Sequence, residues 1–350
     1  METTKALYNY LKENCPQLSE IEVKEHKFNI LDEQVIMLKE CLVNLYKEGH
    51  HKYVNNVLND IINKPTYENG KIYEVLVYDW LNQNKIRYSL QPQIKKEDCF
   101  KSKSDYEADG CISGVIFDVK MFGIGMPIFE KVKEEFQKLA YEDNKRITIN
   151  YPLDLSYENG REMLENKKDI FLALKSEDNK TDDYYRMKWK YGVELCLYPI
   201  GEFVPSFSRF NSCEWAKNNE LYFVKHGSQF CRNKPYMIFC PFDDNIFPLL
   251  PKDEIVYQYL RLLCRRMFIN VSRFSDRMLH DFDGKAVNDC TLSSAMRKVS
   301  AIIFMNVSRR CNNMWVFVNP NADNPIRSFQ IETWFYQKGA YVEDFLYDNY

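Results

Sequence analysis

Residues 106–120 read YEADGCISGVIFDVK, and this stretch sets the fold prediction for the whole chain. Its second half, residues 114–120, is a short apolar run that begins at a glycine and ends in the letters DVK, which is typical of a buried strand. The first half, residues 106–112, is also extended in character. The two halves would therefore form a hairpin that turns near Ser113 and Gly114.

Asp118 and Lys120 differ from the other acid-x-lysine pairs of the chain in their surroundings. At least six further pairs have the same spacing, but all of them lie in polar sequence where both side chains would be hydrated. Residues two apart on a strand face the same side, so Asp118 and Lys120 would lie side by side at the end of a buried strand. Burying both charges is costly unless they pair with each other or bind a metal.

Asp109 supplies a second acid at the start of the preceding strand, from which it would reach Asp118 across the hairpin. Two neighbouring carboxylates repel each other, and a divalent cation relieves that repulsion. Mg²⁺ suits such a site because it takes one or two carboxylates, keeps several waters and accepts phosphate oxygens. A bound metal would polarise a scissile phosphate and activate water. Lys120 would orient or deprotonate that water, or neutralise the transition state.

An acid, an apolar strand and an acid-x-lysine triplet in this order resemble the motif of the PD-(D/E)XK nuclease superfamily, which has the restriction-endonuclease-like fold. The resemblance covers roughly residues 74–141. It implies that Asp109 and Asp118 bind Mg²⁺, with Mn²⁺ able to substitute, and that Lys120 activates the nucleophile. Two departures are present: Ala108 replaces the family's nominal proline, and the second acid is aspartate where glutamate is commoner.

The resemblance also implies an acid on an earlier helix beside the same site. Glu74 is the best match, because it borders the apolar stripe of a predicted helix over residues 70–84. Glu74 would be a catalytic residue that assists through a second metal or a water. Glu68 is a weaker candidate for the same role.

Gln137 and Tyr141 lie on a predicted helix over residues 128–141, with the spacing of the Gln-x-x-x-Tyr motif in the RecB-like branch of the superfamily. Such a motif would place both residues against the substrate. A glutamine and a tyrosine one helical turn apart are also ordinary neighbours. If the motif is real, it favours an exonuclease or an RNA-cutting enzyme.

The formal net charge of -3 argues against a protein held to nucleic acid by its overall charge. Residues 261–310 are different, because they hold ten basic residues and only four acids. This segment is either a solvated helical face or a phosphate-binding surface. The candidate phosphate contacts within it are Arg265, Arg266, Arg273 and Arg277.

The eleven cysteines form no C-x-x-C pair, and the five histidines do not fall at zinc-ligand spacing with them. A disulfide framework and a zinc ribbon are therefore not expected, and a reducing cytoplasm fits better. The N-terminus does not resemble a signal peptide, and no apolar run is long enough for a membrane span. Esterase-type Gly-x-Ser-x-Gly and phosphate-binding P-loop motifs are missing from the sequence.

Strand and helix patterns alternate along the rest of the chain, which predicts an α/β fold. Three regions follow: a helical N-terminal region over residues 1–65, a nuclease-like core over 66–200, and a C-terminal α/β extension over 201–350 that packs on the core and can add strands to its sheet. The other predicted helices span residues 160–174, 252–269 and 292–304, and the other predicted strands span 146–151, 191–198, 236–240 and 315–318.

The sequence therefore predicts a cytoplasmic α/β protein with a restriction-endonuclease-like mixed central sheet flanked by helices. The implied activity is Mg²⁺-dependent hydrolysis of phosphodiester bonds in DNA, as an endonuclease of restriction, defence or repair. RNA is the less favoured substrate, no membrane partner is expected, and a homodimer would supply two active sites for two strands. Two alternatives stay open: an inactive nucleic-acid-binding protein on the same fold, and a RecB-like exonuclease or RNA-cutting nuclease.

Overall fold

The computed structural model divides the chain into two compact units. Unit 1 combines Met1–Phe122 with Leu221–Tyr350, and unit 2 is Gly123–Glu220. The structure describes residues 3–28, 32–63, 70–102, 104–120, 126–151, 155, 157–181, 184–202, 212–242, 253–280, 285–307 and 313–345.

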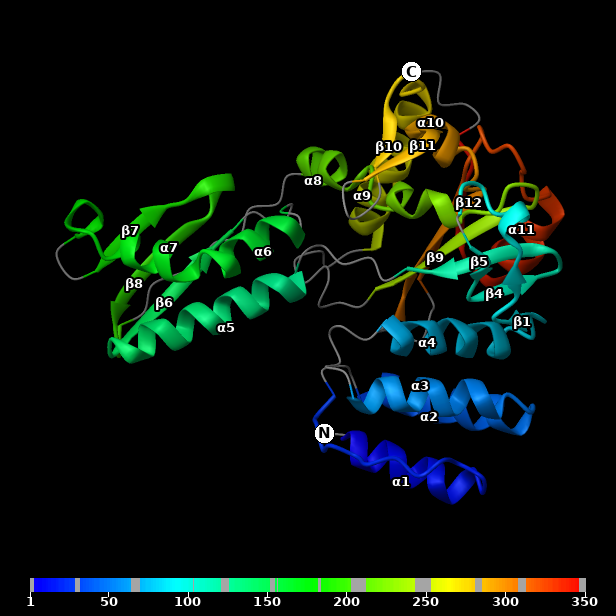
Figure 1. Ribbon diagram of the computed structural model, residues 1–350, viewed down its shortest axis with the longest axis horizontal. Coiled ribbons are helices and arrows are strands. Elements are labelled where there is room, and N and C mark those ends of the chain that lie inside the picture. The colour runs from blue at the N-terminus through cyan, green and yellow to red at the C-terminus, as the bar shows by residue number, and fades with distance from the viewer. Residues whose placement is uncertain are drawn as a thin grey trace. The chain divides into compact units, whose positions relative to one another are not determined.

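Unit 1 is built on a mixed sheet in which seven strands of the described chain pair in the order β1-β4-β5-β9-β12-β13-β14. Pairing is antiparallel from β1 through β4 to β5 and between β12 and β13, and it is parallel at the other three junctions. The strands are β1 (Ser89–Leu90), β4 (Gly110–Ile112), β5 (Val115–Val119), β9 (Tyr236–Phe242), β12 (Ala301–Asn306), β13 (Met314–Val318) and β14 (Tyr341–Glu343). The protein is thus of the α/β class, with a central mixed sheet flanked by helices (Figure 1).

The β4–β5 hairpin turns at Ser113 and Gly114, as predicted. Ile112 pairs with Val115, and the turn residues Ser113 and Gly114 have φ angles of 47° and 87°. Positive φ at both positions is the geometry of a type I′ turn, whose twist matches that of the flanking strands. The turn therefore fixes the register between the two strands.

The N-terminal helices cover one face of this sheet. They are α1 (Thr4–Asn14), α2 (Asp32–Lys47), α3 (His51–Asn63) and α4 (Gly70–Gln83). Helix α4 lies between the sheet and the pair α2–α3, with α1 further out (Figure 1). Residues 72–81 of α4 are all buried, as expected for a helix enclosed on every side. Its Glu74 and Asp79 are therefore buried too.

The opposite face of the sheet carries C-terminal helices. Tyr257 of α9 (Asp253–Arg265) stacks on Phe317 of β13, with ring centroids 6.1 Å apart. Helix α9 runs into one π-helical turn, Arg266–Asn270. The remaining elements of unit 1 are β2 (Gln93–Ile94) paired with β3 (Tyr106–Glu107), β10 (Met278–His280) paired with β11 (Ala286–Thr291), α10 (Leu292–Met296) and α11 (Ser328–Trp334).

Unit 2 has an antiparallel sheet and an apolar core of its own. The sheet order is β6-β8-β7. Residues such as Phe129, Val132 and Phe136 of α5 pack with Ile147 and Leu195 of the sheet. The elements are α5 (Met126–Glu142), β6 (Lys145–Asn150), α6 (Tyr157–Glu165), α7 (Lys167–Leu174), β7 (Tyr185–Lys188), β8 (Glu194–Pro199) and α8 (Ser212–Asn219).

The predicted helix over residues 292–304 is wrong. Helix α10 ends at Met296, and residues 301–306 form β12 between β9 and β13 in the sheet. Every residue of β12 is buried, because both faces of the sheet are covered there. A strand buried on both faces has no alternation of polar and apolar residues, so its apolar run cannot be told from a helix by periodicity. The predicted helix over residues 160–174 is likewise two helices that meet at Asn166.

The compact units do not follow the predicted boundaries after residues 65 and 200. Helices α1–α3 share one apolar core with the sheet, and strands from the region 201–350 complete that sheet. The physical reason is the all-round burial of α4, which requires α2 and α3 on its outer side. Residues 123–220 separate because they enclose a core of their own.

No helix within the described ranges is long and apolar enough to cross a membrane.

Gly110→Ala should destabilise unit 1. A Cβ atom at Gly110 would lie 2.2 Å from the Phe117 Cζ atom of the paired strand, so the core ring must shift. Overpacking of this kind costs about 1–3 kcal/mol. The control is Gly70→Ala at the start of α4, where nothing lies within 4 Å of the new atom. Urea unfolding should show a loss for Gly110→Ala alone, and equal stability of the two variants would contradict this packing.

Candidate active site

Asp118 and Lys120 lie on the same face of the sheet at the end of β5. Asp118 is fully buried, and Lys120 Nζ lies 3.1 Å from Asp118 Oδ2 with 18% of its side chain exposed. The Lys120 main-chain N–H donates to the carbonyl of Phe239 on β9, which continues the strand pairing one residue past β5. The acid and the lysine thus form a buried ion pair.

Asp109 lies directly before β4 and reaches Asp118 across the hairpin. The Asp109 N–H donates to Asp118 Oδ1 at 3.3 Å, and the Val119 N–H donates to Asp109 Oδ2 at 2.7 Å. Each carboxylate therefore accepts a main-chain hydrogen bond from the strand that carries the other. The pairing of Gly110 with Phe117 fixes this reciprocal arrangement.

Glu74 joins the cluster from α4. Its Oε1 accepts from the Tyr53 hydroxyl at 2.8 Å, and its Oε2 pairs with Lys71 Nζ. The Tyr78 oxygen lies 3.0 Å from Glu74 Oε1 and 2.8 Å from the main-chain carbonyl of Asp109, so its single hydrogen can be donated to either. Tyr78 therefore links the glutamate to the segment that carries Asp109.

Two tyrosines hold the carboxylate of Asp118. The hydroxyls of Tyr106 on β3 and Tyr236 on β9 both donate to Asp118 Oδ2, the oxygen that also pairs with Lys120. Tyr236 pairs with Ile116 of β5, and paired residues and residues two apart share a face. The three donors at Oδ2 satisfy a charge that has no access to solvent.

Burial and the charges within the cluster shift the pKa values of Asp109 and Lys120. Burial and the neighbouring charges of Asp118 and Glu74 raise the pKa of Asp109 to about 7, against the pull of Lys120 and the Val119 N–H. Burial lowers the pKa of Lys120, but the charges of Asp118 and Asp109 outweigh it, so the net pKa is raised. Lys120 is therefore an ammonium group at neutral pH.

Several residues of the cluster were not predicted. Tyr106 and Tyr236 open predicted strands, but nothing in the sequence shows that their hydroxyls meet at Asp118. His226 is a further neighbour: burial, and then the positive charge of Lys120, lower its pKa to about 4 although Asp118 opposes this. Its imidazole is therefore neutral beside the ion pair. The unpredicted residues are Tyr53, Lys71, Tyr78, Tyr106, His226 and Tyr236.

Within unit 1, the predicted arginines are not among the described contacts of this cluster. Gln137 and Tyr141 lie on α5, which belongs to unit 2. Glu68 lies outside the described residues. Of the predicted arginines, Arg265 and Arg266 are half-buried where α9 meets its π-helical turn, while Arg273 and Arg277 are exposed.

The donor set fits a divalent cation in its chemistry. Asp109 and Asp118 offer carboxylate oxygens, and one or two carboxylates are enough for Mg²⁺. Burial first, and then the charges of Asp118 and Glu74, raise the pKa of Asp109, and a cation would compensate those charges. In the part of the chain that the structure describes, no group of three or more His, Cys, Asp and Glu side chains is placed to hold a metal. Glu74 instead has its carboxylate engaged by Tyr53, Lys71 and Tyr78.

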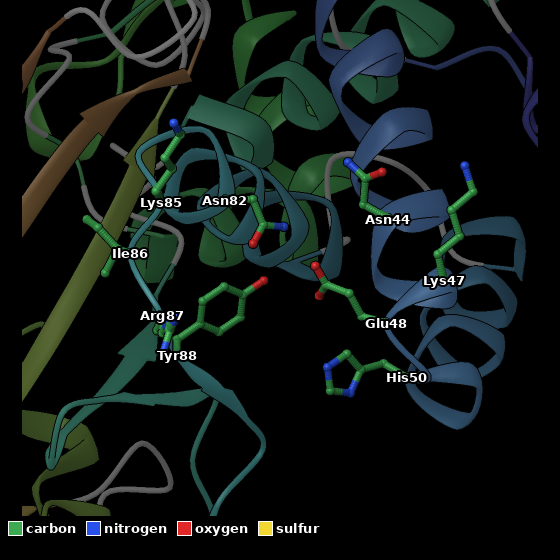
Figure 2. Close-up of a pocket in the computed structure, with 9 residues that line it drawn as sticks. All are labelled: Asn44, Lys47, Glu48, His50, Asn82, Lys85, Ile86, Arg87 and Tyr88. Atoms are coloured by element: carbon green, nitrogen blue, oxygen red, sulfur yellow. The ribbon is translucent and has the colours of Figure 1, made fainter.

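A separate polar pocket of about 690 Å³ lies in unit 1 (Figure 2). The side chains of Glu48, His50, Asn82 and Tyr88 point into it from the ends of α2 and α4 and the segments that follow them. It shares no lining residue with the cluster around Asp118. Tyr88 stacks on Tyr78, however, with ring centroids 5.3 Å apart.

The raised pKa of Asp109 predicts a specific pH dependence. Its pKa of about 7 in the folded state exceeds the value of about 3.9 for an unfolded aspartate. The proton on Asp109 therefore contributes fully to the free energy of unfolding below about pH 4. This contribution is lost as the pH rises to about 7. Urea unfolding across this range should show wild type losing stability relative to Asp109→Asn.

The control for this experiment is Asp105→Asn. The Lys96 N–H and then the Lys95 ammonium lower the pKa of the exposed Asp105, so its contribution changes only below about pH 4. Its stability should run parallel to wild type from pH 5 to 7. Parallel behaviour of Asp109→Asn over the same range would contradict a raised pKa for Asp109.

The described cluster consists of two hydrogen-bonded aspartates, a lysine ion pair, and a glutamate joined to them through a tyrosine. Comparison of the chain with protein-family models, with curated proteins and with solved structures found no match.

Proposed function

We propose that unit 1 is a nuclease that hydrolyses phosphodiester bonds of DNA with the help of Mg²⁺. The observation that carries this proposal is the convergence of Asp109, Asp118 and Lys120 at the end of β5, with Glu74 joined to Asp109 through Tyr78. A purely structural site has little reason to gather three acids, two of them buried, beside only two lysines.

Each residue of the cluster has a separate task in this proposal. Asp109 and Asp118 would hold the cation, which when bound polarises the scissile phosphate and lowers the pKa of a water. Because Lys120 is protonated at neutral pH, it donates hydrogen bonds to the attacking water or to a phosphate oxygen and does not remove a proton. Glu74 adds negative charge from α4, which supports retention of a cation.

The arrangement of unit 1 supports a restriction-endonuclease-like core. Helix α4 carries Glu74 and leads into β1, then the β4–β5 hairpin carries both aspartates and the lysine. The sheet is mixed, and helices flank it on both faces. This is the order of acids and strands that the PD-(D/E)XK resemblance implies.

A second candidate is a nucleic-acid-binding protein without turnover on the same fold. One observation favours it: Oδ2 of Asp118 already accepts from two tyrosines and a lysine, as in a structural carboxylate. Both candidates bind nucleic acid, but only the nuclease cleaves it. Cleavage with Mg²⁺ therefore separates them.

Lys120→Ala should reduce cleavage by at least about 100-fold, because the transition state loses its ammonium donor. The protein is incubated with plasmid, linear duplex, single-stranded DNA and RNA, each with Mg²⁺ or EDTA. The matched control is Lys180→Ala, since Asp178 and Lys180 have the same acid-x-lysine spacing and Lys180 is about half exposed. Absence of metal-dependent cleavage of every substrate, or equal rates for wild type and Lys120→Ala, would end the enzyme proposal.

Arg273 and Arg277 are the exposed members of the predicted phosphate-binding arginines. Replacing both by alanine should weaken binding of duplex DNA in EDTA and reduce the slope of log K against log salt by about one per lost phosphate contact. The control is Lys5→Ala on α1, an exposed cation outside this segment. An unchanged salt dependence in the double variant would show that DNA does not contact Arg273 and Arg277. Sedimentation of the same samples tests the proposed homodimer.

A further inference from the structure

Cys99 and Cys231 lie directly opposite each other on two antiparallel segments of unit 1. The flanking hydrogen bonds run from the Phe100 N–H to the Phe230 carbonyl and from the Arg232 N–H to the Asp98 carbonyl, each 2.7 Å long. No hydrogen bond joins the two cysteines themselves in this pattern. They therefore occupy a non-hydrogen-bonded pair, the position at which side chains come closest.

The backbone geometry at such a pair suits a disulfide. Opposed residues in a non-hydrogen-bonded pair have Cα atoms about 4.5 Å apart, within the range of about 4.4–6.8 Å that disulfides span. Both thiols are buried, and none of the ten cysteines that the structure describes is joined in a disulfide. The Cys99 thiol donates a weak hydrogen bond to the Ile94 carbonyl.

The paired segments lead to both tyrosines that hold Asp118. Tyr106 of β3 follows Cys99 by seven residues, and Tyr236 at the start of β9 follows Cys231 by five. Their hydroxyls meet at Asp118 Oδ2. A covalent bond between the cysteines would tie together the two segments on which this arrangement depends.

We propose that Cys99 and Cys231 form a reversible intramolecular disulfide when the protein meets a small-molecule disulfide such as oxidised glutathione. The thiolate of one cysteine attacks a sulfur of the oxidant and releases one glutathione thiolate. The thiolate of the other cysteine then attacks the protein sulfur of this mixed disulfide and releases the second. Two protein thiols are oxidised, one glutathione disulfide is reduced to two thiols, and the two protons pass to the released thiolates.

The environment of Cys99 makes this reaction slow. Burial, and then the neighbouring Cys231, raise the pKa of the Cys99 thiol to about 11. Little thiolate is present at neutral pH, so the dithiol form persists and the bond forms by equilibration with the oxidant over hours. Cys240 and Cys264 are also buried and interact, but they belong to β9 and α9, and no strand pairing sets their backbones face to face.

Mass spectrometry of non-reduced peptides tests the proposal on wild-type protein. The protein is equilibrated with oxidised glutathione under native conditions, and free thiols are blocked with N-ethylmaleimide before digestion. A peptide pair joined through Cys99 and Cys231 should accumulate and disappear with dithiothreitol. Cys231→Ser should abolish it, and Cys111→Ser, the matched control on β4, should leave it unchanged.

The exposed Cys213 reports whether the oxidant acted, because it should form a mixed disulfide with glutathione. Cys99 and Cys231 recovered as free thiols while Cys213 is modified would overturn the proposal, and so would a bond from Cys99 to any other cysteine. The bond closes a loop of about 130 residues and should raise the thermal midpoint by roughly 5 °C in oxidised wild type but not in oxidised Cys231→Ser. Neither readout uses catalysis, so failure here leaves the nuclease proposal intact.

Discussion

The buried negative charge of Asp118 is the constraint on which unit 1 depends. A carboxylate without solvent contact is stable only when its oxygens are paired, and here the partners come from three strands. Lys120 extends β5, Tyr236 opens β9, and Tyr106 lies on β3. A slip in strand register would move both tyrosines away from Asp118 and leave only Lys120, which follows on the same strand, to pair with its charge. The charge therefore selects the register, in addition to the apolar side chains that pack beneath the sheet.

The acids and bases of the cluster are not balanced. Glu74, Asp109 and Asp118 lie beside two lysines, Lys71 and Lys120, so one negative charge remains uncompensated. Burial first, and then the charges of Asp118 and Glu74, raise the pKa of Asp109, so a proton on Asp109 can compensate the extra charge. A cation at the two aspartates compensates the same charge without a proton. The proposed Mg²⁺ would thus take the place of the proton on Asp109.

Local periodicity was enough to predict part of this site. Asp118 and Lys120 share a face because they are two residues apart on a strand, and Asp109 reaches them through a tight turn. Tyr236 could not be predicted, since it meets Asp118 from 118 residues away through the parallel pairing of β5 with β9. The same limit explains residues 301–306, where burial on both faces removes the pattern that separates strand from helix. Contacts set by sheet register lie outside the reach of single-sequence patterns.

The pairing of Asp118 also determines how a cation would compete for it. A carboxylate has about four lone-pair positions. Asp118 accepts from three donors at Oδ2 and from one at Oδ1, so a cation would have to displace one of them. The tyrosines and the Asp109 N–H are fixed by the strands that carry them, but Lys120 is a flexible side chain with partial exposure. Lys120 is therefore the donor that can leave. In the proposed nuclease, a phosphate beside the site would attract the released ammonium, so binding of substrate and binding of cation would favour each other at Asp118.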